Sequence, residues 1–225
     1  MNKLIIPTIR NFLLGVIVLG LMLFLPAWTL NYWQAWVFIL LFMVLLSAGG
    51  VYFSIKDPAL IERRLQTVPT EGTSTGQKIF VVVAFLGDIA LLVFSALDHR
   101  FGWSRVPPYV SWVGDLLVVL SCLIWYFVFR ENSFAASAVQ TFEEQKVIST
   151  GPYAFVRHPL YVGVLVLIIG IPLALGSWWG LLFFVLVSLG LVWRILGEEK
   201  LLKKDLPGYI EYTKRVRYRL VPYVW

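Results

Sequence analysis

Hydrophobic residues run along this chain in long stretches that short polar segments separate. We identify six such stretches, at residues 12–30, 33–55, 79–97, 109–129, 160–175 and 177–197. A helix needs about 20 mostly apolar residues to cross the hydrocarbon core of a bilayer. The pattern therefore predicts an all-α, polytopic integral membrane protein with about six transmembrane helices. Gly176 and Ser177 separate the last two stretches, so we expect a tight C-terminal helical hairpin, followed by an amphipathic cytoplasmic tail.

The composition supports the same class of protein. Hydrophobic residues make up 59% of the 225 residues, charged residues make up 14%, and the mean hydropathy is +0.79. This excess of apolar residues excludes a soluble globular domain, a disordered chain and a secreted disulfide scaffold. The single Cys122 excludes an internal disulfide. Because the chain has only two histidines, His99 and His158, we expect no metal site, and we expect His99 in an outer surface loop.

Nearly all of the positive charge falls on one side of the predicted membrane. Of the 19 Lys and Arg residues, only Arg100 and Arg105 lie in segments on the other side. Cytoplasmic loops carry the excess of Lys and Arg, so this bias predicts that both termini are cytoplasmic, in what we expect to be a prokaryotic inner membrane. Attraction to anionic membrane lipids then explains the net charge of +6, and no nucleic-acid partner is expected.

Two acidic residues interrupt the apolar stretches, and both have two interpretations. Asp88 lies near the middle of the third stretch, and Asp115 lies in the outer part of the fourth. Acidic residues inside a membrane are rare and often functional, so these side chains would line a polar cavity. Alternatively, each is protonated and hydrogen-bonded between helices. The polar segment 66–78 is expected to be a cytoplasmic loop without a chemical role.

The segment before the fifth stretch carries the best candidate chemistry. Pro159 suits the first position of a helix, because its missing N–H needs no partner there. The free N–H groups of that helix start would then lie at the cytoplasmic interface beside Arg157 and His158, with Tyr161 in the first turn. Such a helix start is suited to binding an anionic group.

The short hairpin predicts that two distant segments meet. The sixth stretch returns to the cytoplasmic side and ends at Glu198 and Glu199, which should lie close to residues 157–161. Neighbouring residues on a helix point about 100° apart, so at most one glutamate can face the site. We expect the other one to meet the basic tail. The simpler alternative is that all of these are ordinary charged side chains that extend from helix ends into the interface.

The tail from Leu201 to Trp225 combines basic and aromatic residues. This combination predicts a short amphipathic helix on the membrane surface, which would fold back over the site as a lid. Its arginines would either bind an anionic substrate or attach the tail to anionic lipids.

These residues resemble a known family. The pattern Arg157-His158-Pro159-x-Tyr161, followed after one hydrophobic hairpin by Glu198-Glu199, is similar to that of the isoprenylcysteine carboxyl methyltransferase family. The similarity covers about residues 130–225 and includes the turn at residues 147–153 and the tail residues Tyr209, Tyr212, Val216 and Pro222. Phospholipid methyltransferases and membrane sterol reductases have versions of the same pattern.

The resemblance implies S-adenosylmethionine as methyl donor and a carboxylate of a lipid-like or lipidated molecule as acceptor. It assigns the donor to the residues that match the family pattern, namely Gly151, Pro152, Tyr153, Arg157, His158, Pro159, Tyr161, Glu198 and Glu199. It assigns the acceptor and its orientation to a catalytic group, namely Glu131, Asn132, Arg215 and Arg217. The lipid part of the acceptor would enter sideways between the fourth and fifth spans.

The resemblance also divides the chain into an N-terminal transmembrane region, residues 1–108, without an assigned motif, and a methyltransferase core, residues 109–225. Two other functions stay open. An NADPH-dependent enzyme related to sterol reductases would need a larger set of spans and a dinucleotide pocket. The chain contains no G-x-G-x-x-G pattern, so we expect the methyl donor to bind at the C-terminal spans rather than at a Rossmann-type site. A non-catalytic small transporter or assembly factor would need a polar path through several spans.

Overall fold

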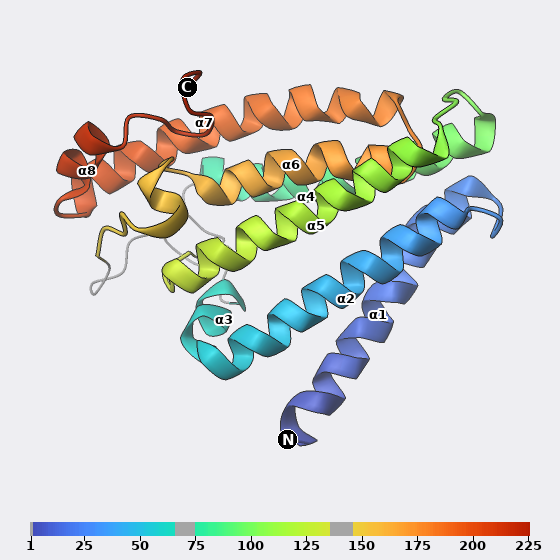
Figure 1. Cartoon of the computed structure of the whole chain (residues 1–225), viewed down its shortest axis with the longest axis horizontal. Helices are drawn as coiled ribbons and strands as arrows, with labels where there is room; N and C mark the ends of the chain where they lie inside the picture. The colour runs from blue at the N-terminus through green and yellow to red at the C-terminus, as the bar shows by residue number, and fades with distance from the viewer. Residues whose placement is uncertain (1, 66–74, 136–145) are drawn as a thin grey trace.

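The computed structural model describes residues 2–65, 75–135 and 146–225, and in these residues the chain is all helical (Figure 1). The helices in chain order are α1 (Asn2–Ala27), α2 (Trp33–Lys56), α3 (Pro58–Leu65), α4 (Thr75–Phe101), α5 (Pro108–Glu131), η1 (Gly151–Ala154), α6 (Pro159–Ala174), η2 (Trp179–Leu181), α7 (Leu182–Asp205) and α8 (Tyr209–Arg215). The predicted loop at 66–78 lies mostly outside the described residues, and its end belongs to α4.

Five of these helices are long and apolar enough to cross a membrane, and α6 is a shorter apolar helix of 16 residues. The long ones are α1, α2, α4, α5 and the η2–α7 unit. Their outward-facing positions expose many large apolar side chains, as lipid-facing surfaces do. The prediction of an all-α polytopic membrane protein is therefore confirmed, and the helix pattern matches the six predicted stretches.

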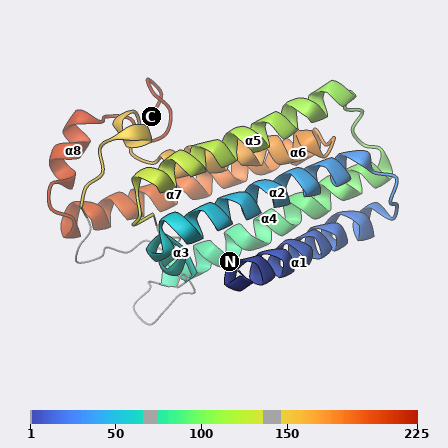
Figure 2. The same ribbon diagram turned by 60° about the horizontal axis from the view of Figure 1, so that its bottom comes forward.

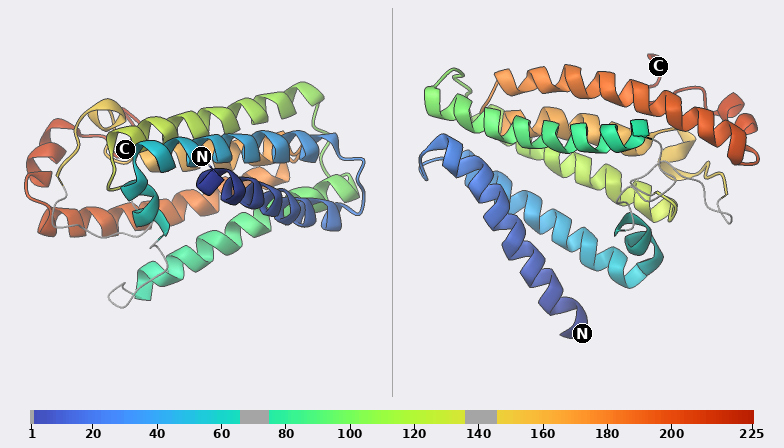
Figure 3. Two further views of the ribbon diagram at one scale, coloured as in Figure 1. Left: turned by 90° about the horizontal axis from the view of Figure 1, so that it is seen from below. Right: turned by 180° about the vertical axis from the view of Figure 1, so that it is seen from behind.

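The helices lie roughly along one direction, with their connections gathered at two ends (Figures 2 and 3). One end holds α3, η1 and α8, and we refer to it as the α8 end. The opposite end holds the turns α1–α2 and α6–α7 and the connection α4–α5. The predicted boundary at residue 108 falls at the start of α5, and the apolar core draws on helices from both sides of it.

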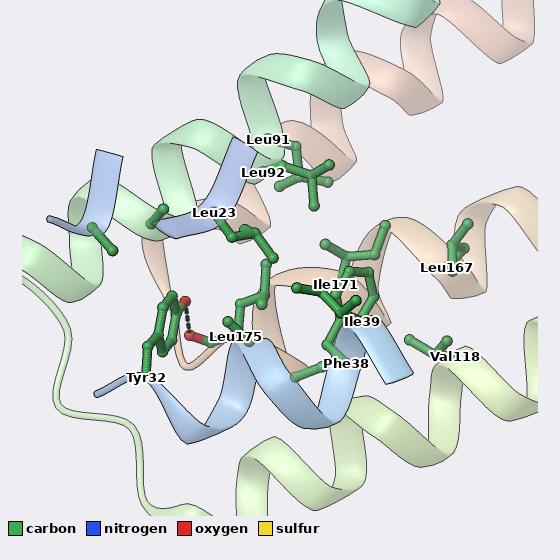
Figure 4. Packing of buried hydrophobic residues seen from close by; sticks show 14 of the residues in the cluster. Leu23, Tyr32, Phe38, Ile39, Leu91, Leu92, Val118, Leu167, Ile171 and Leu175 are labelled. Atoms are coloured by element: carbon green, nitrogen blue, oxygen red, sulfur yellow. Dashed lines mark hydrogen bonds between the residues drawn. The ribbon is translucent and has the colours of Figure 1, made fainter. Parts of the chain in front are cut away.

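The core lies in the half of the bundle near the α6–α7 turn (Figure 4). It packs residues from α1, α2, α4, α5 and α6, including Leu23, Phe38, Leu91, Val118 and Ile171. Tyr32, which is fully buried, donates a hydrogen bond of 2.6 Å to the carbonyl oxygen of Leu175. This bond ties the start of α2 to the end of α6.

The prediction that His99 lies in a surface loop is wrong. Helix α4 continues to Phe101, and the half-buried ring of His99 stacks on Tyr32 with 3.8 Å between ring centroids. The preceding Asp98 is fully buried and accepts hydrogen bonds from Ser104 and Ser177. These contacts hold the end of α4 against the α6–α7 turn, so polar residues that suggested a loop instead join helices.

The two acids within the spans also differ from expectation. Asp88 is exposed on the outer face of α4, and neither predicted arrangement describes it. Asp115 on α5 is buried at 5% exposure, but neither of its carboxylate oxygens has a hydrogen-bond partner among the described residues. Neither acid lines the cavity described below.

Helices α5 and α6 are in close contact along their length because small residues line the seam between them. A Cβ atom at Gly114 would overlap the backbone of Ala174, and one at Gly163 would overlap the indole of Trp125. A Cβ at Gly170 would lie 3.1 Å from the carbonyl oxygen of Gly114. Small residues allow transmembrane helices to approach in this way. Helices α5 and α6 therefore approach closely at these three glycines, and entry of a lipid between the fourth and fifth spans stays a prediction.

This seam makes a testable prediction. Gly114→Ala should lower the stability of the protein by about 1–3 kcal/mol, because the added methyl group meets backbone atoms of α6 that cannot rotate away. The matched control is Gly87→Ala on α4, where nothing lies within 4 Å of the added atom. Thermal unfolding in detergent measures both variants. Equal unfolding temperatures would contradict the close α5–α6 packing.

Candidate active site

A cavity lies at the α8 end, where η1, the start of α6, the end of α7 and α8 meet. Its described polar lining residues are Asn132, Lys146, Tyr153, Arg157, His158, Tyr161, Arg194, Glu198, Tyr209 and Tyr212. Apolar side chains such as Leu160, Leu202 and Leu206 complete the wall. The cavity thus combines one acidic group, several cations and four phenols with apolar side chains.

Local sequence explains how the polypeptide reaches this place. Gly151 adopts φ +56°, and a Cβ atom there would lie 2.6 Å from the Glu131 side chain, so glycine is required both for conformation and for space. The 3₁₀ turn η1 follows at once and carries Tyr153 toward the cavity. Pro159 then occupies the first turn of α6, as the sequence predicts, and His158 is the residue that precedes the helix.

The tail holds this segment in place by backbone hydrogen bonds. The N–H of Arg157 donates to the carbonyl oxygen of Tyr218 at 2.9 Å, and the N–H of His158 donates to that of Arg219 at 3.0 Å. The Arg157 guanidinium also donates to the carbonyl oxygens of Val216 and Arg217. The tail therefore runs directly along the residues that precede α6.

Glu199 is the centre of a buried ion cluster. Its side chain is 3% exposed and lies 2.8 Å from Arg157 Nε, 3.4 Å from His158 Nε2 and 3.1 Å from Arg219 Nη2. Lys203, one turn further along α7, approaches to 3.8 Å from the solvent side. One carboxylate thus joins α7, the start of α6 and the tail, and its position makes it a structural link between these elements.

Glu198 points elsewhere and lines the cavity. It accepts a hydrogen bond of 2.7 Å from the hydroxyl of Tyr161, and the same hydroxyl accepts one of 2.8 Å from Arg194 Nε. The Arg194 guanidinium also lies over the Phe80 ring, 4.6 Å from its centroid. The chain Arg194–Tyr161–Glu198 therefore sets a cation, a phenol and a carboxylate along one wall.

A second polar group comes from α5, η1 and α8. Asn132 Nδ2 donates to the Tyr153 hydroxyl at 2.9 Å, and the Tyr212 hydroxyl donates to the Tyr153 carbonyl oxygen at 2.8 Å. Burial raises the pKa of Tyr153 to about 12, and nearby Glu198 adds to the increase while Asn132 opposes it. Tyr153 is therefore neutral at physiological pH. Tyr209, 4% exposed, has a hydroxyl without a hydrogen-bond partner among the described residues.

The structure brings together most of the residues assigned to the donor, but not all those assigned to the acceptor. Asn132 lines the cavity, whereas Glu131 instead accepts a hydrogen bond from Thr150 beside it. The side chains of Arg215 and Arg217 are exposed and do not contribute to its wall. The expected role of these two arginines next to the site is therefore not supported by their positions.

The site assigned from the sequence lacks four residues that lie near it, namely Arg194, Tyr209, Tyr212 and Arg219. Tyr209 and Tyr212 belong to the tail pattern of the family resemblance, but the resemblance assigns no role to them. The spacing in the sequence could have indicated Arg194, because it precedes Glu198 by four residues and therefore lies on the same face of the helix. For Arg219 no spacing rule applied, since it lies beyond α8 in an irregular tail.

Comparison with known proteins adds an independent finding. Residues 109–207 match the family described as phospholipid methyltransferase. The chain is also similar to the delta(14)-sterol reductase TM7SF2 of Mus musculus, at 28% identity over 165 residues. That similarity covers 65% of this chain and 39% of the reductase, so the chain spans less than half the length of this relative. The family match includes nearly all of α5 and the whole of η1, α6, η2 and α7, and it ends just before α8.

Proposed function

We propose that this protein is a membrane methyltransferase, because residues 109–207 match the phospholipid methyltransferase family model. In this proposal it transfers a methyl group from S-adenosylmethionine to a carboxylate of a lipid-like acceptor. The observation that carries the proposal is the wall formed by Arg194, Tyr161 and Glu198, which lies inside the matched segment. It sets an anionic and a cationic group side by side in one cavity at the end of the bundle.

The lining residues fit the chemistry of the donor. Glu198 is the only carboxylate among the described lining residues, and it complements the positive charge of an amino group or a sulfonium. The buried Tyr209 hydroxyl has no hydrogen-bond partner among the described residues, so it is available to hydrogen-bond to a ligand in the cavity. When bound, S-adenosylmethionine would supply an electrophilic methyl group, which leaves its bonding electrons on sulfur and bonds to a carboxylate oxygen of the acceptor.

The chain's own residues would orient the acceptor and exclude water. A carboxylate is already ionised at neutral pH, so no strong general base is needed. Arg194 is 8% exposed and lines the cavity, and we assign it the acceptor-orienting role in place of Arg215 and Arg217. The tail at residues 216–219 runs along the start of α6 and limits access of water from that side. Holding the two reactants in line is the main contribution to the rate.

Donor binding tests the proposal directly. Titration calorimetry of the purified protein in detergent should show saturable binding of S-adenosylmethionine, with competition from S-adenosylhomocysteine. Incubation with labelled donor and a lipid extract should then give a methyl ester that mass spectrometry detects and mild base removes. Absence of saturable donor binding would contradict the proposal, and a base-stable methylated product would contradict the carboxylate acceptor.

A second function has one observation in its favour, namely the similarity to a sterol reductase. An enzyme of that kind would bind NADPH, so the same calorimetry with NADPH in place of S-adenosylmethionine distinguishes the two. We expect no saturable NADPH binding. For a transporter, the acids within the predicted apolar stretches are Asp88 and Asp115, and they do not form a path, since one is exposed on α4 and the other is buried in α5.

A further inference from the structure

An apolar groove lies between α2, α3, α5 and α6, next to the cavity and on the side away from the α6–α7 turn. Its walls include Leu46 and Phe53 of α2, Leu60 of α3, Cys122 of α5 and Val164 of α6. Two of these four helices, α2 and α3, lie outside the segment that matches the family. The N-terminal region thus forms one wall of the groove, and the segment that matches the family forms the other.

The groove and the cavity border each other, and two features mark the border. Leu160 lines both of them. Arg64 lines the groove, and its guanidinium donates a hydrogen bond of 3.0 Å to the carbonyl oxygen of Ala135, a residue that lines the cavity. The same guanidinium lies over the Phe129 ring at 4.4 Å. A positive charge therefore lines the apolar groove on the side that borders the candidate active site.

Two glycines of α2 leave open space in this groove. Gly49 and Gly50 line the groove in the middle of α2, and nothing lies within 4 Å of a Cβ atom built on either one. Glycine inside a helix is less favourable than alanine. Close packing does not explain Gly49 and Gly50, because a side chain at either position would meet open space. At Gly114, Gly163 and Gly170, by contrast, the absent side chain lets α5 and α6 touch.

We propose that this groove binds the hydrocarbon chain of the methyl acceptor, an anionic amphiphile with a single chain. Its head group would first bind beside Arg64, where the groove borders the cavity, and would then be oriented by Arg194 inside the cavity for the transfer. This inference rests on the proposed methyl transfer. The apolar walls bury the chain, Arg64 complements the negative head, and Leu160 marks where the acceptor reaches the donor site. The α2–α3 region then selects the acceptor.

A photoreactive palmitate with an aliphatic diazirine tests the groove in phosphatidylcholine nanodiscs. Mass spectrometry should find labelling in α2, α3 and α5 that excess unlabelled palmitate removes. Gly49→Trp, which fills the groove, should lower this saturable labelling by about tenfold, because burial of roughly two methylene groups is lost. The control Gly87→Trp places the same side chain at an open position on α4, outside the groove, and should leave the labelling unchanged.

The charge of the groove is tested by a pair of neighbouring arginines. Arg63 and Arg64 both donate to backbone carbonyls of residues 133–135, but only Arg64 lines the groove. Arg64→Gln should lower saturable labelling by palmitate about threefold, while labelling by a neutral photoreactive hexadecanol stays unchanged; Arg63→Gln should alter neither.

The outcomes separate this inference from the proposed function. The groove assignment is overturned if no saturable labelling is found, or if Gly49→Trp and the unchanged protein are labelled equally. Either result overturns it even where donor binding is intact. S-adenosylmethionine affinity in Gly49→Trp should stay within about twofold of the unchanged protein, because residue 49 lies outside the cavity. A protein that binds palmitate in the groove but never binds the donor would overturn the methyltransferase proposal instead.

Discussion

Glu199→Gln is expected to lower the stability of the protein by about 3–5 kcal/mol, since it removes the anion from a buried cluster and leaves its cations without compensation. The carboxylate is 3% exposed and within 3.1 Å of two arginines, Arg157 and Arg219. Glutamine preserves the shape and one acceptor oxygen, so the loss reports charge rather than packing. Thermal unfolding in detergent, or limited proteolysis of the tail, measures the effect.

Lys203→Gln is the matched control for this prediction. Lys203 belongs to the same cluster, but its side chain is 47% exposed and lies 3.8 Å from Glu199. A solvated ion pair of this kind contributes at most about 1 kcal/mol. If Glu199→Gln unfolds at the same temperature as Lys203→Gln, the cluster is not what joins the tail to α6 and α7.

The transmembrane helices could be predicted because their physical cause is local. An apolar stretch of about 20 residues has few alternatives to a membrane helix, and its composition is visible in the sequence. The end of α4 was harder to predict because Asp98 and His99 are polar residues that find partners across the bundle, in Ser177 and Tyr32. Partners of that kind depend on the tertiary structure, which no periodicity reveals.

The part of the candidate site that depends on helix connectivity could be predicted from the sequence. A tight hairpin must bring the end of the sixth span beside the start of the fifth, and residues 157–161 do lie next to Glu198 and Glu199. The direction of each glutamate was not predictable, since it depends on the rotation of α7. Nor was the arginine of the tail that turns inward: Arg219 reaches Glu199, whereas Arg215 and Arg217 extend into solvent.

Glu198 and Glu199 are adjacent in sequence, yet their surroundings differ, so we expect different effects when each is substituted. Glu199 is enclosed by protein cations, so its loss should affect folding before it affects ligands. Glu198 has a partner in Tyr161 but also faces the cavity, so its charge is accessible to a bound molecule. Substituting both together would merge a folding effect with a binding effect, and single substitutions are needed to separate them.

Glu198→Gln should therefore raise the dissociation constant for S-adenosylmethionine by roughly ten- to a hundredfold while leaving the unfolding temperature nearly unchanged. A hydrogen bond to a charged group contributes about 1.5–3 kcal/mol, and glutamine cannot replace the charge that a cationic ligand requires. Glu211→Gln, an exposed acid on α8, controls for the general loss of one negative charge. Calorimetry measures the affinity; equal affinities in the two variants would mean that Glu198 does not face the donor, and the cavity would lose its assigned ligand.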